Sequence, residues 1–126
     1  VVNTRHTVQN LGLRLEAGSP TKVFCYSGDG MFTPTASKLY TNADLLVHEA
    51  YTSDGTVKNP RGETVTIGTK THCSLQQLER LDDMARPKKM ALIHLNRKLR
   101  EEKKDILKKY RQRRWIMPDA GEVIEL

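Results

Sequence analysis

The sequence of 126 residues has no apolar run near the roughly 18 residues that a membrane-spanning helix needs, and no charged-then-apolar leader. We therefore expect neither a signal peptide nor a membrane span. Cysteine is scarce: Cys25 and Cys73 lack C-x-x-C spacing and are too few for a disulfide-stapled secreted fold. We expect reduced, structural thiols and a cytoplasmic location. The sequence starts Val-Val-Asn without an initiator Met, so a processed or truncated N-terminus is also expected.

Aromatic residues make up only 6% of the sequence, which leaves few rings for stacking on nucleic-acid bases. The net charge is +6, but 13 of the 21 Lys and Arg lie within residues 86–114, so the positive field is local. This basic segment could contact the phosphates of a nucleic acid. It could also be the solvated face of a helix, because Glu101, Glu102 and Asp105 alternate with lysines at helical spacing. We favour the solvated face.

The pattern of apolar residues predicts strands alternating with helices. Runs at 11–16 and 22–26, separated by Ala-Gly-Ser-Pro, predict a β-hairpin. Continuous apolar runs at 43–49 and 89–94 predict buried strands, and two short closing strands are expected at 115–117 and 123–126. The order of elements indicates a layered α/β domain with some antiparallel pairing in its sheet.

Three helices are expected between these strands. Thr33 and Pro34 suit the start of a short helix, and Ser74 suits the cap of a second helix. The second helix should bury the apolar residues at helical spacing, which are Leu75, Leu78, Leu81 and Met84. Residues 97–113 predict a third, amphipathic helix. Residues 51–71 are expected to form a long surface loop of functional importance, with a small ribbon around 64–67.

Histidines and one aspartate stand where predicted strands begin or end. Asp29 lies in Ser-Gly-Asp-Gly directly after a strand, His94 ends another strand, and His6 precedes one. Taken singly, each has an ordinary interpretation: a turn residue, a buried histidine or a surface residue. As a set they suit zinc, manganese or iron, because imidazole nitrogens and a carboxylate are the ligands these metals take. The three residues are therefore a candidate metal site.

Four segments in order resemble the metallo-β-lactamase superfamily: Tyr-Ser-Gly-Asp at 26–29, Ala-Asp-Leu-Leu-Val-His-Glu-Ala at 43–50, Thr-His-Cys-Ser at 71–74 and Leu-Ile-His at 92–94. The sequence is most similar to the ribonuclease Z-like phosphodiesterases, which process tRNA 3′ ends. In that branch a strand ends in His-Glu-Ala-Thr, a His-Ser-Thr follows, and the last strand ends in a metal-binding His. The resemblance implies an α/β fold, half of a metallo-β-lactamase-type αββα sandwich, with a mixed sheet and helices on one outer face.

The resemblance also implies roles for five residues. Asp29 corresponds to the ligand that bridges two metals, His94 to a terminal ligand of the second metal, and His6 to a ligand of the first. His72 corresponds to the residue that protonates the leaving group, and Glu49 to the carboxylate that orients it. The implied cofactors are two divalent metal ions, zinc in the first place and manganese or iron as alternatives, with a metal-bridging hydroxide as nucleophile. The sequence departs from the pattern at Gly30, Tyr51 and Cys73-Ser74.

The resemblance covers residues 1–126 as the C-terminal half of the family's domain, and the family's His-x-His-x-Asp-His motif is absent. Since three ligands cannot hold a dinuclear site, we expect the N-terminal half of the same domain, a partner chain or a homo-oligomer to complete it, and a nucleic acid is a candidate substrate. A fragment standing alone should expose one apolar sheet face. Two alternatives stay open: a non-catalytic fragment or subunit serving in assembly or RNA binding, and a hydrolase of another ester.

Overall fold

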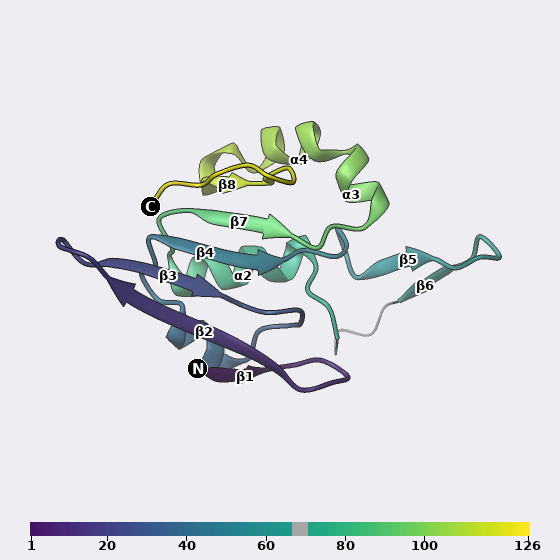
Figure 1. Cartoon of the computed structure of the whole chain (residues 1–126). Helices are drawn as coiled ribbons and strands as arrows, with labels where there is room; N and C mark the ends of the chain where they lie inside the picture. Colours follow the sequence, from purple (N-terminus) through teal and green to yellow (C-terminus); the bar gives the residue numbers. More distant parts are fainter. Residues whose placement is uncertain (67–70) are drawn as a thin grey trace.

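A computed structural model describes residues 1–66 and 71–126 of the chain, and within these ranges the main sheet has six strands in a mixed arrangement (Figure 1). The strands are β1 (Val2–Thr4), β2 (Asn10–Ala17), β3 (Lys22–Tyr26), β4 (Leu45–Glu49), β7 (Met90–Ile93) and β8 (Trp115–Ile116). They lie in the order β1-β2-β3-β4-β7-β8. β1, β2 and β3 pair antiparallel, whereas β3, β4, β7 and β8 pair parallel. The predicted α/β class and the opening hairpin are confirmed.

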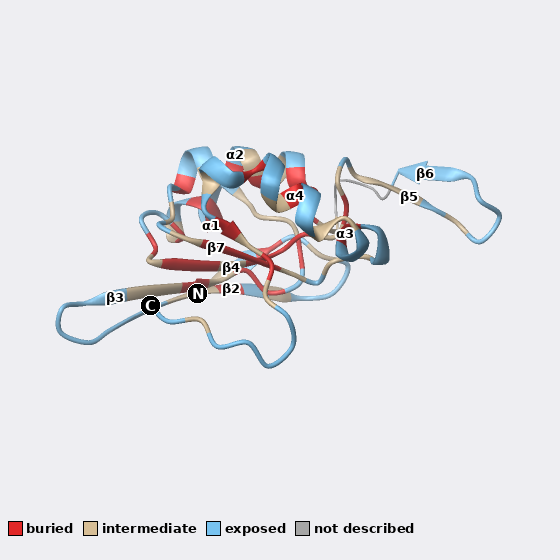
Figure 2. Cartoon of the chain, turned by 90° about the horizontal axis from the view of Figure 1, so that it is seen from above, coloured by how far each residue is buried: buried red, intermediate tan, exposed pale blue. Residues whose placement is uncertain are grey.

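Helices cover one face of this sheet, as the edge-on view in Figure 2 shows for α1, α2 and α4. The helical elements are α1 (Pro34–Leu39), α2 (Leu75–Ala85), α3 (Arg97–Glu101), α4 (Lys103–Lys109) and the 3₁₀ turn η1 (Arg111–Arg113). The two predicted caps are present: Thr33 accepts the backbone N–H of Ala36, and Ser74 forms a reciprocal capping box with Gln77. These caps fix where α1 and α2 begin beside the loops that carry polar side chains.

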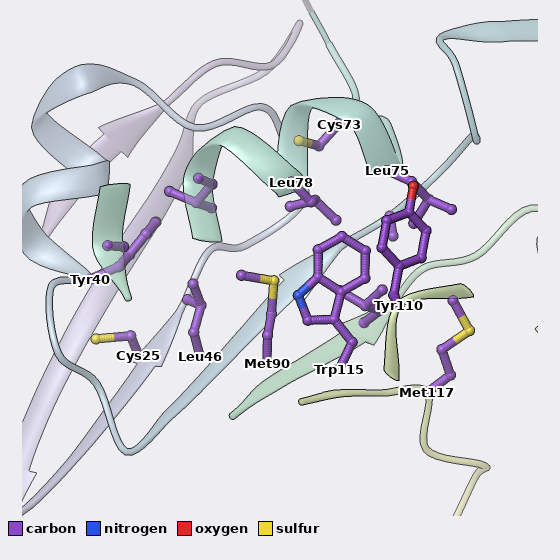
Figure 3. Packing of buried hydrophobic residues seen from close by; sticks show 14 of the residues in the cluster. Cys25, Tyr40, Leu46, Cys73, Leu75, Leu78, Met90, Tyr110, Trp115 and Met117 are labelled. Atoms are coloured by element: carbon purple, nitrogen blue, oxygen red, sulfur yellow. The ribbon is translucent and has the colours of Figure 1, made fainter. Parts of the chain in front are cut away.

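The core lies between the sheet and the helices (Figure 3). Leu46 and Met90 point from adjacent parallel strands toward the buried face of α2, which contributes Leu78, and Tyr110 stacks on Trp115 with ring centroids 4.4 Å apart. Both cysteines are free and buried, and burial raises the pKa of each thiol. The thiols are held as structural groups, as the sequence predicted.

The opposite face of the sheet is apolar. Paired positions of neighbouring strands share a face, and one row across five strands consists of Leu13, Tyr26, Val47, Ala91 and Ile116. On β2 the same face continues in Leu11 and Leu15, which are 44% and 58% exposed. Among the described residues no helix lies over this face (Figure 2). Within the row Ala91 is buried and the other four residues are half-buried, so the accessible apolar surface of this face lies mainly at Leu11 and Leu15.

Three details of the predicted elements differ. Met84 is 53% exposed, because one further residue along α2 brings Ala85 onto the buried side instead. Residues 97–113 form a chain of short helices, since the backbone at Glu102 and Tyr110 departs from helical angles. Residues 123–126 form no strand and pair with none of the described strands.

The expected long loop contains a two-stranded ribbon, β5 (Thr56–Lys58) with β6 (Thr64–Thr66), that projects beyond the end of the sheet (Figure 1). The predicted ribbon is confirmed up to Thr66, and residue 67 lies outside the described ranges. None of the described helices is long and apolar enough to cross a membrane.

His48 sits on β4 and is fully buried with one ring nitrogen unsatisfied. Its Nδ1 lies 2.9 Å from the carbonyl oxygen of Glu49 and can donate to it, while Nε2 has no partner among the described residues. Phe32 and Tyr40 present their rings to it at 6.4 and 6.3 Å between centroids. Because protonation would place a charge in these apolar surroundings, burial lowers the pKa of His48 to about 4.

This lowered pKa predicts a loss of stability in mild acid. The unfolded chain binds a proton at His48 near the ordinary pKa of about 6.5, whereas the folded chain resists it until about pH 4, so acid favours unfolding. The stabilisation is complete above about pH 6.5 and is lost as the pH falls toward 4, with a total of roughly 3 kcal/mol from the 1.36 kcal/mol per pKa unit. Urea unfolding at several pH values measures it. His48→Gln should flatten the dependence over this window, and identical profiles for the two proteins would show that His48 is not the titrating group.

Candidate metal centre

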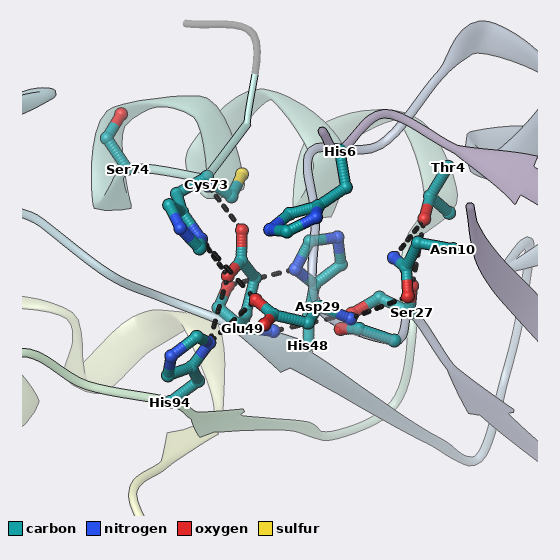
Figure 4. Close-up of polar contacts among 12 residues, drawn as sticks. Thr4, His6, Asn10, Ser27, Asp29, His48, Glu49, Cys73, Ser74 and His94 are labelled. Atoms are coloured by element: carbon teal, nitrogen blue, oxygen red, sulfur yellow. Dashed lines mark hydrogen bonds and ion pairs between the residues drawn. The ribbon is translucent and has the colours of Figure 1, made fainter. Parts of the chain in front are cut away.

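The parallel part of the sheet brings three polar side chains to one edge (Figure 4). Asp29 follows β3, Glu49 ends β4 and His94 follows β7. Since these three strands are parallel neighbours, their carboxyl ends lie together, where layered α/β folds place their sites. The sequence therefore positions these side chains simply by ending each buried strand in a polar residue.

Two glycines shape the turn that carries Asp29. Gly28 has a φ of +68°, and a Cβ there would lie 2.8 Å from the backbone oxygen of Leu11. A Cβ on Gly30 would lie 2.6 Å from the backbone oxygen of Arg5, so this position also admits only glycine without a shift. The turn is held from outside by Asn10, whose side-chain oxygen accepts the N–H of Asp29. The glycines allow the close approach that the Ser-Gly-Asp-Gly pattern predicted.

His72 reaches the same edge from the segment before α2. The N–H of Tyr51 donates to the carbonyl of Cys73 at 2.9 Å, and the N–H of Cys73 donates to Oε1 of Glu49 at 2.6 Å. These two bonds anchor the segment against the end of β4. The second carboxylate oxygen of Glu49 is left to face the His72 ring.

The side chains form two close histidine–carboxylate pairs, and each histidine also lies near the carboxylate of the other pair. His94 Nδ1 lies 2.7 Å from Asp29 Oδ1, and His72 Nδ1 lies 2.8 Å from Glu49 Oε2. The crossed distances are 3.4 Å from His72 to Asp29 and 3.3 Å from His94 to Glu49. One ligand atom from each of the four residues lies within 4.8 Å of the others, close enough to hold a metal ion. The two nitrogens and two carboxylates are a donor set that fits zinc, manganese or iron.

His6 borders this group without joining it. Its ring centroid lies 5.2 Å from that of His72, in an edge-on arrangement. The loop that carries it is tied to the Asp29 loop by two backbone hydrogen bonds between Arg5 and Met31, of 2.8 and 2.9 Å. All five residues singled out from the sequence therefore gather in one place: four in the cluster of possible ligands, and His6 beside it.

The backbone at His94 is unusual, because its φ is +52° although it is not glycine. Residues other than glycine adopt this left-handed conformation rarely and at an energetic cost, and they do so mostly at functional sites. Here the left-handed turn ends β7 and turns the imidazole toward Asp29. The conformation is consistent with a site that holds this ring in a set direction.

The pKa values of the two carboxyl groups, Asp29 and Glu49, are shifted in opposite directions. Burial acts to raise the pKa of Asp29, but its hydrogen bond with Glu49 and the nearby His94 and His72 outweigh this and bring it below the ordinary value. Glu49 is fully buried, and burial together with the Asp29 carboxylate raises its pKa to about 8. Asp29 is thus the ionised member of the pair at neutral pH, and it is also the more exposed one.

One residue of the site was not assigned a role from the sequence. Tyr51 stacks on His72, with ring centroids 4.6 Å apart and an angle of 25° between the planes, and its ring also meets His94 edge-on at 5.5 Å. Its place two residues after Glu49 was the available signal, since the chain leaving β4 must pass the site. Tyr51 forms a wall that holds the His72 ring against Glu49.

Comparisons with known proteins relate this arrangement to solved structures. No family model matches the chain, and no curated protein matches it. Human tRNase Z, short form, superposes with a TM-score of 0.60 at 21% identity over 78% of this chain and 36% of that chain. The metallo-beta-lactamase fold protein YhfI from Bacillus subtilis gives a TM-score of 0.60 at 22% identity over 83% of this chain and 41% of that chain.

These similarities show the fold. The chain has the architecture of part of a metallo-β-lactamase-type domain, as the resemblance implied, and the match covers only 36% and 41% of the two solved structures. Their full domains contain elements beyond those described here.

The cluster predicts a measurable metal affinity that depends on Asp29 and His94. Titration calorimetry with zinc should detect binding, and Asp29→Asn or His94→Ala should weaken it by at least the 10- to 100-fold that even the loss of a supporting residue costs. Asp54→Asn removes an exposed carboxylate outside the cluster and is the matched control, for which we expect no change. Equal zinc affinity in all four proteins would rule out this cluster as the ligand set.

Proposed function

We propose that the chain supplies the C-terminal part of the active site of a metal-dependent phosphodiesterase of the ribonuclease Z-like kind. The observation that carries this proposal is the pairing of His72 with the buried Glu49 directly beside the Asp29–His94 pair. A metal-ligand set alone would suit many hydrolases, including those of other esters. A separate histidine held by a buried carboxylate adds a proton donor, which a phosphodiester needs because its leaving alkoxide is a poor leaving group.

In this proposal Asp29, His94 and His6 contribute ligands for two divalent cations, zinc in the first place. Bound there, such cations would lower the pKa of a water molecule and neutralise charge on the phosphoryl oxygens. Asp29 suits the shared position because it is ionised and its Oδ1 already lies within 3.4 Å of two imidazoles. The side chains of Asp29 and His94 are 50% and 41% exposed, so both remain accessible to ligands from elsewhere in the domain.

His72 would donate a proton to the leaving oxygen through Nε2, because its Nδ1 is engaged by Glu49. The carboxylate cannot swing away, since its other oxygen accepts the N–H of Cys73 and the whole side chain is buried. The stacked Tyr51 restricts rotation of the ring from the other side. His72 is thus a general acid whose orientation is set by Glu49 and Tyr51.

The rest of the site would come from outside the described residues. The His-x-His-x-Asp-His motif is absent from the sequence, and in the apolar row through Leu13, Tyr26, Val47, Ala91 and Ile116 all residues but Ala91 are only half-buried. We propose that the N-terminal half of the same domain, or a partner chain with that motif, packs on this face and adds the missing ligands. Covering the face with a second copy of the chain would explain the apolar surface but would leave the motif missing.

The proton-donor role can be tested with two substrates that differ in leaving group. With the protein purified together with any chain that completes it and loaded with zinc, His72→Asn should lower kcat for an oligoribonucleotide by about 10²- to 10⁴-fold. For bis(p-nitrophenyl) phosphate the loss should be far smaller, because p-nitrophenolate leaves without a proton. His6→Asn is the matched control in the same site. If His6 is a metal ligand, its loss should depress both reactions alike, and equal losses for His72→Asn would contradict a general-acid role.

A further inference from the structure

A groove of about 610 Å³ opens beside the site, between the β5–β6 ribbon and the start of α3. Tyr51 and three basic residues, Lys58, Arg97 and Lys98, are among its lining residues. The ribbon that forms one wall projects past the carboxyl ends of β4 and β7 (Figure 1). None of the roles proposed above for the metal ligands or the proton donor uses it.

The charges in the groove favour an anionic occupant. Asp54 is the one acidic residue among the lining side chains, and its Oδ1 is occupied by the N–H and hydroxyl of Thr56 at 3.0 and 2.8 Å. Lys98 pairs with no carboxylate among the described residues. Arg97 gives its Nε to Glu101 outside the groove, which leaves its two terminal nitrogens available. The groove is therefore lined by three positively charged side chains and one carboxylate, which already accepts hydrogen bonds from Thr56.

Tyr51 belongs to both the groove and the site. Its ring stacks on His72 and also forms part of the groove wall, and its carbonyl accepts the N–H of Asn96 from the opposite wall. In the proposed function, His72 protonates the leaving oxygen. The groove thus shares Tyr51 with the residue proposed to protonate the leaving oxygen.

We propose that this groove binds backbone phosphates of a single-stranded nucleic acid, in the part of the strand that departs with the leaving oxygen. The proposal rests on the proposed function for its direction, whereas binding itself needs no catalysis. Lys58, Arg97 and Lys98 contact phosphates, and Tyr51 offers an aromatic face to the nucleotide nearest the site. This assigns a nucleic-acid contact to a small part of the basic segment and to the ribbon, while the rest of that segment stays a solvated face.

The test measures binding of a fluorescein-labelled oligouridylate of about eight nucleotides, a length within the usual range for single-strand sites, by fluorescence anisotropy at several salt concentrations without added metal. Replacing Lys58, Arg97 and Lys98 together by Ala should weaken binding. It should also lower the magnitude of the slope of log K against log salt by about 2, since each phosphate contact on a single strand contributes about 0.7.

A second triple variant gives a matched control: Lys104→Ala, Lys108→Ala and Arg111→Ala remove the same charge from exposed positions outside the groove. We expect this control to keep the slope of the wild-type protein. Equal losses in both variants would mean general attraction to a basic protein, and a loss only in the control would place the contact on α4 and η1. Either outcome overturns the proposal, as does a slope unchanged in both.

The failures of the two proposals can be told apart. If His72→Asn shows no leaving-group dependence while the groove variant still lowers the salt slope, the groove binds nucleic acid but the proposed chemistry is wrong. If the leaving-group test succeeds and the salt slope does not change, the phosphodiesterase stands and the groove proposal is wrong.

Discussion

The parallel pairing of β3, β4 and β7 is the constraint on which the rest of the structure depends. Its register places the ends of three buried strands side by side, and each strand is followed or closed by an ionisable residue: Asp29, Glu49 and His94. The apolar residues within the strands bury the sheet on the helical side, where His48 is the exception on β4. The loops that carry His72 and His6 are held beside these strand ends by backbone hydrogen bonds at Cys73 and Arg5.

The burial of Glu49 is energetically unfavourable, and it gives the two carboxylates of the site different pKa values. Burial and the nearby Asp29 carboxylate both disfavour the ionised form of Glu49, so its pKa rises to about 8 while Asp29 remains ionised. The Cys73 N–H and the His72 ring compensate the buried group. Without a bound cation the cluster therefore concentrates negative charge on Asp29, at the exposed side of the site, where a cation would arrive.

The sequence predicted those features that leave a local pattern of residue types along the chain. Continuous apolar runs ending in Glu49 and His94, and glycines around Asp29, predicted strand ends and a tight turn, and the resemblance connected them with His6 and His72. It could not place Tyr51, because a stacked ring follows from the path of a loop and not from any periodic pattern. The break at Glu102 and the unpaired end at 123–126 were missed for the same reason: pairing and helix continuity depend on tertiary neighbours.

The central claim is that this chain is one side of a metal site completed across its apolar face. Mass spectrometry of the purified protein under native and denaturing conditions, combined with elemental analysis of the same sample, tests it most directly. The account predicts about two divalent metal ions per particle, as in two-metal sites. They are held either by one polypeptide longer than these 126 residues or by a complex that separates into this chain and a second polypeptide on denaturation. A metal-free single chain in both conditions would contradict it.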